Sequence, residues 1–176
     1  MFVADVLRFH PRCPFKLKSG QMVRLPAMLA LMRAIGTNRP MAVHRTALKP
    51  DGSGKANLPD GSNPKKMLGP AKGAVIKLPA DEDVTHGLAL SEGIETALTA
   101  VCAGWRPVWA SGTAGAIRRF PVLPGVKALT IFADPDPTGC KAARVCAERW
   151  AEADREAAVI LPPSDDCDWN DIGRAA

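Results

Sequence analysis

Two aspartates, Asp134 and Asp136, follow a short apolar run at residues 129–133. A continuous apolar run with β-branched and aromatic members is typical of a buried strand, and polar side chains at its end can reach a ligand. Residues two apart in an extended chain point to the same side, so both carboxylates can enter one small volume. Two like charges held that close require a cation, and Mg²⁺ prefers oxygen ligands. The pair therefore predicts a Mg²⁺ site at the carboxyl end of a strand, followed by a stiff loop because of Pro135 and Pro137.

The residues around this pair predict alternating strands and helices. We expect strands at residues 74–78, 88–90, 107–110, 129–133 and 157–161, and helices at about 94–103, 114–120 and 142–153. Such alternation is typical of a parallel sheet covered by helices, in which ligands bind beyond the carboxyl ends of the strands. Glu92 follows one of these strands, so we expect it to lie beside Asp134 and Asp136. The acidic tail that contains Asp168 and Asp171 should reach the same edge.

The first half of the chain is basic and the second half is acidic. Residues 1–77 contain fourteen Lys and Arg against three Asp and Glu, whereas residues 78–176 contain nine against fifteen. This asymmetry suggests a surface for a polyanion beside an acidic metal pocket. Apolar segments at 22–32 and 41–48, separated by turn residues, predict a hairpin or small sheet, with a short helix within 27–34 as an alternative. We therefore expect a smaller N-terminal α+β lobe over residues 1–80 and an α/β domain over residues 81–176.

The N-terminal lobe contains two segments that predict little regular structure. Residues 1–20 read as irregular chain with a short strand at 6–9, and residues 49–70 are rich in Gly, Pro, Asn and Asp, which predicts an exposed, mobile loop. Basic loops suit phosphate-backbone contacts, which need charge more than fixed geometry. The candidate nucleic-acid-binding residues are Arg45, Lys49, Lys55, Lys65, Lys66 and Lys72.

The composition excludes several classes of protein. A chain of 176 residues with 47% apolar and 23% charged residues is typical of a globular protein and not of a disordered one. No apolar run approaches the roughly 20 residues of a membrane span, and no secretory signal is visible, so we expect a cytoplasmic protein without a membrane partner. The five cysteines are scattered and never spaced as Cys-x-x-Cys, which indicates neither a disulfide framework nor a zinc ribbon.

The acidic motifs resemble those of a known family. The Glu92-Gly93 pair after one strand, and Asp134-x-Asp136 followed by Gly139 after a later one, resemble the TOPRIM domain of bacterial-type primases, topoisomerases and some nucleases. The residues from 91 to 97, 132 to 139 and 168 to 171 resemble most closely the primase-like TOPRIM proteins of phages, plasmids and other mobile elements. Residues 43–46, 51–56 and 68–70 also resemble the segment before TOPRIM in those proteins.

The resemblance implies a Mg²⁺-dependent DNA primase-type nucleotidyltransferase with a TOPRIM-like Rossmannoid sheet. It implies that Asp134 and Asp136 bind Mg²⁺, with Mn²⁺ as a substitute, and that Glu92 is a general acid/base or a further ligand. Asp168 and Asp171 match acidic residues that bind additional metal in primases. Many primases have an acidic residue four positions after the glutamate, whereas this chain has Thr96 there and Glu95 one position earlier.

The implied partners are single-stranded DNA, nucleotides and a replicative helicase. Primases of this kind usually carry a zinc-binding module upstream and often a helicase downstream, and neither occurs in these residues. The resemblance therefore supports a catalytic TOPRIM part more directly than independent primase activity.

Three other functions fit the same residues. A TOPRIM lobe could bind DNA or a helicase without catalysis, and a TOPRIM nuclease would use the same carboxylates. The string Asp134-x-Asp136-x-Thr138 also fits the nucleophile motif of haloacid-dehalogenase-like phosphatases, although that motif usually lies on the first strand of its domain.

Overall fold

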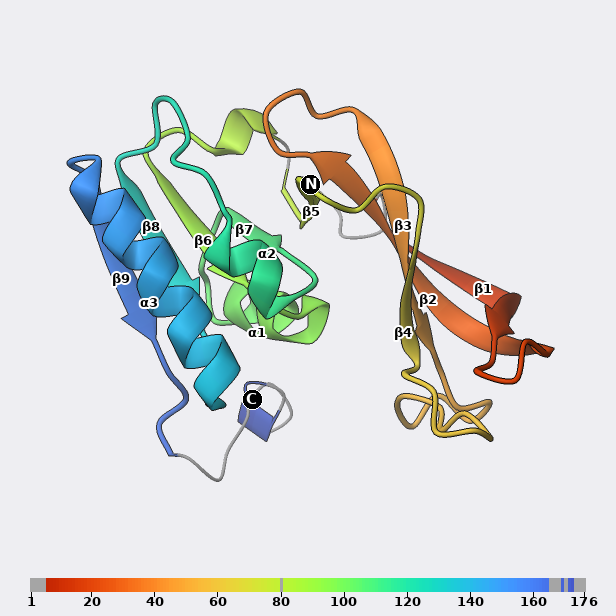
Figure 1. Ribbon diagram of the computed structural model, residues 1–176. Helices are drawn as coiled ribbons and strands as arrows, with labels where there is room; N and C mark the ends of the chain where they lie inside the picture. Colours follow the sequence, from red (N-terminus) through yellow and green to blue (C-terminus); the bar gives the residue numbers. More distant parts are fainter. Residues whose placement is uncertain (1–5, 80, 165–168, 170, 173–176) are drawn as a thin grey trace.

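The computed structural model describes residues 6–79, 81–164, 169 and 171–172. In these residues nine strands form one mixed sheet (Figure 1). The strand order is β4-β3-β2-β5-β7-β6-β8-β9, and β1 pairs with β2. The first five strands are antiparallel to their neighbours, and the last four are parallel to one another. The predicted combination of a parallel sheet flanked by helices and a smaller N-terminal lobe is confirmed.

The N-terminal lobe is built from strands. Its elements are β1 (Leu7–Lys16), β2 (Met22–Ala34), β3 (Pro40–Ala47), β4 (Lys65–Leu68) and β5 (Ala74–Lys77). Residues 27–34 belong to β2, so the alternative of a helix there is wrong, and residues 6–79 show no α-helix to match the α part of the predicted α+β lobe. The long antiparallel pairing of β2 with β1 and β3 explains this, because ladder hydrogen bonds outweigh weak local propensity.

Two lobe segments are more regular than their composition predicts. The strand β1 continues past Pro11 and Pro14, because its register shifts between His10 and Cys13 and an irregular edge strand tolerates proline. The expected loop at 49–70 contains β4, which is paired with β3. In the same 49–70 segment, Ala56 and Leu58 are buried in a small hydrophobic core of the lobe. The prediction of an exposed loop is therefore wrong for these two positions.

The second half of the chain has the predicted alternation. After a 3₁₀ turn (Asp81–Asp83), its elements are β6 (Gly87–Ser91), α1 (Ile94–Cys102), β7 (Val108–Ala110), α2 (Ala114–Arg118), β8 (Ala128–Phe132), α3 (Pro137–Glu152) and β9 (Glu156–Ile160). Residues of α1 pack in one core cluster, and residues of α2 and α3 pack in another, so the helices cover both faces of the sheet. The predicted boundary at residues 80 and 81 stays a prediction, and Ala80 lies outside the described residues.

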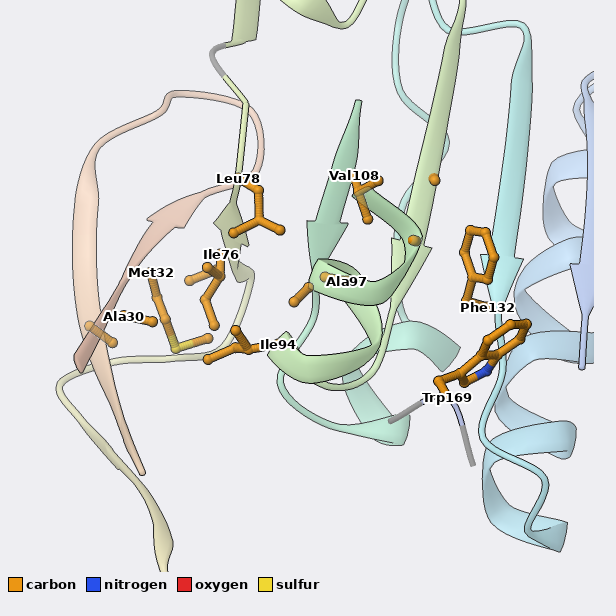
Figure 2. Packing of buried hydrophobic residues seen from close by; sticks show 14 residues of the cluster. Ala30, Met32, Ile76, Leu78, Ile94, Ala97, Val108, Phe132 and Trp169 are labelled. Carbon is orange, nitrogen blue, oxygen red and sulfur yellow. The ribbon is translucent and has the colours of Figure 1, made fainter. Parts of the chain in front are cut away.

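The two halves share a sheet and a core. The strand β5 pairs with β2 on one side and with β7 on the other, which joins the lobe to the parallel strands. Figure 2 shows Met32 and Ile76 from β2 and β5 close to Ile94 of α1, and all three are almost fully buried. The lobe is therefore fixed to the parallel sheet by both hydrogen bonds and apolar contacts.

The connections leave a crevice between β6 and β8. The chain leaves β6 toward β7 on one side and leaves β8 toward β9 on the other, and β6 and β8 are parallel neighbours. Such a reversal of strand order opens a crevice at the carboxyl ends of the two strands. Glu92 and Asp134 follow the ends of these strands. In the described part of the chain, no helix is long and apolar enough to cross a membrane.

Candidate active site

Glu92 lies in the tight turn between β6 and α1. The Ser91 hydroxyl donates a 2.9 Å hydrogen bond to the carbonyl of Gly93, which is the N-cap residue of α1. The backbone N–H of Gly112, just after β7, donates to the carbonyl of Glu92 at 2.8 Å. The segment after β7 thus holds the backbone of Glu92 in place. The side-chain carboxylate takes no part in this bond and stays available for a ligand.

The carboxylate of Glu92 lies in an acidic environment. Burial raises its pKa, and the charge of Asp134 raises it further. The backbone N–H of Ala114 lowers the pKa, Asp136 raises it and Lys65 lowers it, with a net upward shift. The three predicted carboxylates therefore lie within electrostatic range of one another, and the free energy of the charged Glu92 would fall if a cation bound between them.

Asp136 has a structural role that the sequence analysis did not predict. It is the N-cap of α3, and its Oδ1 accepts hydrogen bonds from the backbone N–H groups of Thr138 at 2.7 Å and Gly139 at 2.9 Å. Pro137 begins α3, where a missing N–H costs nothing, so the predicted loop ends at Asp136. One carboxylate oxygen of Asp136 is thus occupied by the helix, and Oδ2 takes no part in these two bonds.

Gly139 allows α3 to approach Asp134 closely. A Cβ atom at this position would lie 2.7 Å from the carbonyl oxygen of Asp134 and 3.3 Å from its Cβ. Only glycine fits this contact without a shift of the backbone. The glycine after the Asp-x-Asp pair therefore sets the distance between the end of β8 and α3.

The donor set fits a cation that is completed by a substrate. No three His, Cys, Asp or Glu side chains among the described residues are close enough to enclose a metal. Mg²⁺ keeps several waters and is usually held by one or two carboxylates together with substrate phosphates. Glu92, Asp134 and Oδ2 of Asp136 supply such carboxylate oxygens. The residues therefore fit a Mg²⁺ ion whose remaining ligands are waters and substrate phosphates.

The acidic tail reaches the end of β8. The indole Nε1 of Trp169 donates a 2.9 Å hydrogen bond to the carbonyl of Ala133, and its ring packs edge-to-face on Phe132 with centroids 5.1 Å apart. Figure 2 shows the two rings side by side. Asp171 is exposed and has helical backbone geometry, and Asp168 lies outside the described residues. The metal-binding role predicted for both stays a prediction.

The candidate basic residues divide into two groups. Lys65 and Lys66 line a pocket of about 510 Å³ together with His44, Glu92 and Asp134. The other four candidates are not among the residues that line this pocket. The Arg45 guanidinium donates a hydrogen bond to the carbonyl of Pro14 and lies over the ring of Phe15, and Lys49 is exposed. Lys55 forms an ion pair with Glu95, and Lys72 lines a neighbouring cavity. The structure thus brings two of the six candidate basic residues into the pocket that contains the carboxylates of Glu92 and Asp134.

Two pocket neighbours were not predicted as site residues. His44 is 4% exposed, its Nδ1 has no hydrogen-bond partner, and burial and the charge of Lys65 lower its pKa. Glu95 forms ion pairs with Lys55 and Lys65. Two signals were available in the sequence. The alternation along β3 points His44 and Arg45 to opposite faces, and Glu95 lies three residues after Glu92, in the first turn of α1.

Comparisons with known proteins agree with this geometry. The sequence profile of the Toprim domain matches residues 87–176, and that of a domain of unknown function (DUF7146) matches residues 2–78. No curated protein is similar enough in sequence to count as a relative.

Several solved primase structures have a similar fold. The primase fragment of the bacteriophage T7 primase-helicase protein has a TM-score of 0.60 and 15% identity, over 86% of this chain and 59% of that one. A DNA primase domain from Pseudomonas aeruginosa has a TM-score of 0.61 and 16% identity, over 98% and 63%. The DnaG primase catalytic domain bound to ssDNA has a TM-score of 0.59 and 16% identity, over 92% and 53%. The chain thus spans about six-tenths of the first two and about half of the third.

Proposed function

Because this chain belongs to the Toprim domain family, we propose that it is the catalytic part of a DNA primase-like replication protein that joins nucleotides in a Mg²⁺-dependent reaction. One observation carries the proposal: Glu92 and Asp134 line one pocket with Lys65, at the carboxyl ends of β6 and β8. Carboxylates facing a lysine suit a ligand that brings both a cation and phosphate groups. The primase folds of the neighbouring structures support the same reaction class.

The proposed mechanism assigns a role to each side chain. Asp134 and Asp136 would hold Mg²⁺, or Mn²⁺ in its place, which would supply positive charge next to the phosphate that is transferred. Glu92 completes this site or holds a proton on its carboxylate, which its raised pKa favours. Lys65 faces the same pocket and attracts the phosphate groups of the incoming nucleotide.

We extend the proposal to nucleic-acid and protein partners. Single-stranded DNA would lie along the basic lobe, where Lys66 also lines the pocket, and the DnaG domain of similar fold was solved with ssDNA. The T7 neighbour is the primase fragment of a primase-helicase protein, which supports a replicative helicase as a partner of this chain. The role of Arg45, Lys49, Lys55 and Lys72 in DNA binding is part of the proposal.

Primer synthesis on single-stranded DNA tests the function. The purified chain, with Mg²⁺ or Mn²⁺ and labelled nucleotides, should synthesise primers on the single-stranded template, and both Asp134→Asn and Glu92→Gln should abolish this synthesis. Asp154→Asn is the matched control, because Asp154 lies beyond α3 with a φ of 58° that asparagine also adopts. Full activity of Asp134→Asn would contradict the assignment.

The same reactions separate the alternatives. Binding of DNA without synthesis would favour a non-catalytic module, and metal-dependent cleavage of the template would favour a nuclease. Membership of the Toprim family removes the main reason for the phosphatase alternative, and a generic phosphate monoester provides the check.

A further inference from the structure

A cluster of three charged side chains joins the lobe to α1 beside the pocket. The Nζ of Lys55 lies 2.9 Å from Oε1 of Glu95, and the Nζ of Lys65 lies 3.5 Å from Oε2 of the same carboxylate. All three side chains are between one quarter and two-fifths exposed. One carboxylate thus divides its two oxygens between two lysines that come from the other half of the protein.

The two lysines have fixed backbones. Lys55 forms an isolated bridge with Leu48. Lys65 is the first residue of β4, where it pairs with Thr46, and its N–H donates to the Asn63 side chain at 2.8 Å. Their side chains therefore start from positions that would persist if Glu95 moved away.

The cluster is electrostatically coupled to the pocket. Lys65 lines the pocket with Glu92 and Asp134, and its charge lowers the pKa of Glu92. Burial raises the pKa of Glu95, but the hydrogen bond from Lys55 and the charge of Lys65 outweigh it, so Glu95 is ionised near neutral pH. The partly exposed ion pairs are weak enough for another anion to replace the carboxylate.

We propose that Glu95 is an internal counter-anion, which pairs with Lys55 and Lys65 and offsets part of their charge in the free protein, and which releases them to a phosphate group of a nucleotide or of single-stranded nucleic acid. This inference rests on the proposed function only for the identity of the ligand. In the free state the three charges sum to one positive charge. After the exchange, two lysines face the phosphate, and the lobe gains a phosphate contact next to the carboxylate site.

Binding assays with Glu95→Gln test the exchange. We measure the affinity of the full chain for a labelled single-stranded oligonucleotide, and in a separate arm for ATP, in EDTA without divalent metal. The variant should bind about fivefold more tightly at low salt, because no ion pair has to be broken. For the oligonucleotide, its log–log salt dependence should steepen by up to about 0.7, the value for one lysine charge at a single strand that Glu95 no longer compensates. An effect on the oligonucleotide alone identifies the nucleic-acid backbone as the ligand, and an effect on ATP alone identifies the nucleotide.

Controls isolate the three side chains. In a Lys55→Gln/Lys65→Gln background, Glu95→Gln should have no effect, and Glu148→Gln, an exposed carboxylate on α3, should not alter affinity in either background. If Glu95→Gln does not fold, Lys55→Gln alone still tests the idea, because it should weaken oligonucleotide or ATP binding about threefold. Weaker or unchanged binding by Glu95→Gln, or no binding by any form, would overturn the proposal. The assay needs no metal, so the outcome is independent of primer synthesis and can be repeated on Asp134→Asn.

Discussion

Replacing Asp136 should separate helix capping from metal binding. In Asp136→Ala, the N–H groups of Thr138 and Gly139 lose the acceptor that lies 2.7 and 2.9 Å away. The loss of such a cap costs about 1 kcal/mol, and the loss of a negative charge at the helix N-terminus costs a further ~0.5 kcal/mol. For a domain of this size we expect a fall in Tm of about 3–6 °C.

Asp136→Asn should affect only the charge. The amide Oδ1 can accept the same two hydrogen bonds, and asparagine is as good an N-cap as aspartate. We therefore expect the free energy of unfolding to fall by at most about 0.5 kcal/mol, the cost of the lost charge at the helix N-terminus. If Asp136 also binds Mg²⁺, both variants should lose metal-dependent activity, because neither keeps the negative charge of Asp136 beside Asp134.

Thermal unfolding by circular dichroism in EDTA, together with primer synthesis in Mg²⁺, measures the two effects independently. The asparagine variant should unfold like the wild type and be inactive, whereas the alanine variant should be both less stable and inactive. Equal destabilisation of the two variants would refute the capping argument. Wild-type activity of Asp136→Asn would refute the metal assignment and leave Asp136 as a cap alone.

Three further substitutions test the surroundings of the site. Gly139→Ala should lower the free energy of unfolding by about 1–3 kcal/mol in urea denaturation and displace Asp134, although alanine normally favours a helix. Because the folded pKa of Glu92 is raised, its protonation stabilises the protein below the unfolded pKa, and this contribution is lost as pH rises through the folded pKa. Glu92→Gln should therefore raise Tm at pH 7 without metal and have no such effect at pH 3. Trp169→Phe should cost about 1–2 kcal/mol, because the carbonyl of Ala133 loses its 2.9 Å donor, and calorimetry would measure it.

The parallel half of the fold could be predicted because its signals are local. Each strand there is a short apolar run, and each helix has one apolar face, so the pattern alone gave the elements from β6 to β9. Parallel strands place their carboxyl ends at one edge, which is why Glu92 and Asp134 could be expected in one pocket despite their distance in sequence. Their catalytic roles stay predictions.

The N-terminal lobe was harder to predict because its structure depends on pairing. The strand β4 has only four residues, flanked by Asn, Gly and Pro, and it forms because β3 supplies its hydrogen bonds. The cap formed by Asp136 was visible in the sequence as Asp-Pro at a helix start, but the same pattern also fits a loop. The ion pairs of Glu95 depend on contacts between the two halves, which no local pattern contains.

The site is therefore a product of both halves of the chain. Glu92 and Asp134 come from the acidic half, whereas His44 and Lys65 come from the basic lobe, and all four line the same pocket. The lobe forms one side of the pocket and the parallel strands form the other. The pairing of β5 with both β2 and β7 fixes the distance between these two sides. The lobe consequently forms one wall of the pocket, in addition to its proposed role as a surface for nucleic acid. A change at the β5 junction, for example at the fully buried Ile76, should alter the pocket without touching a charged residue.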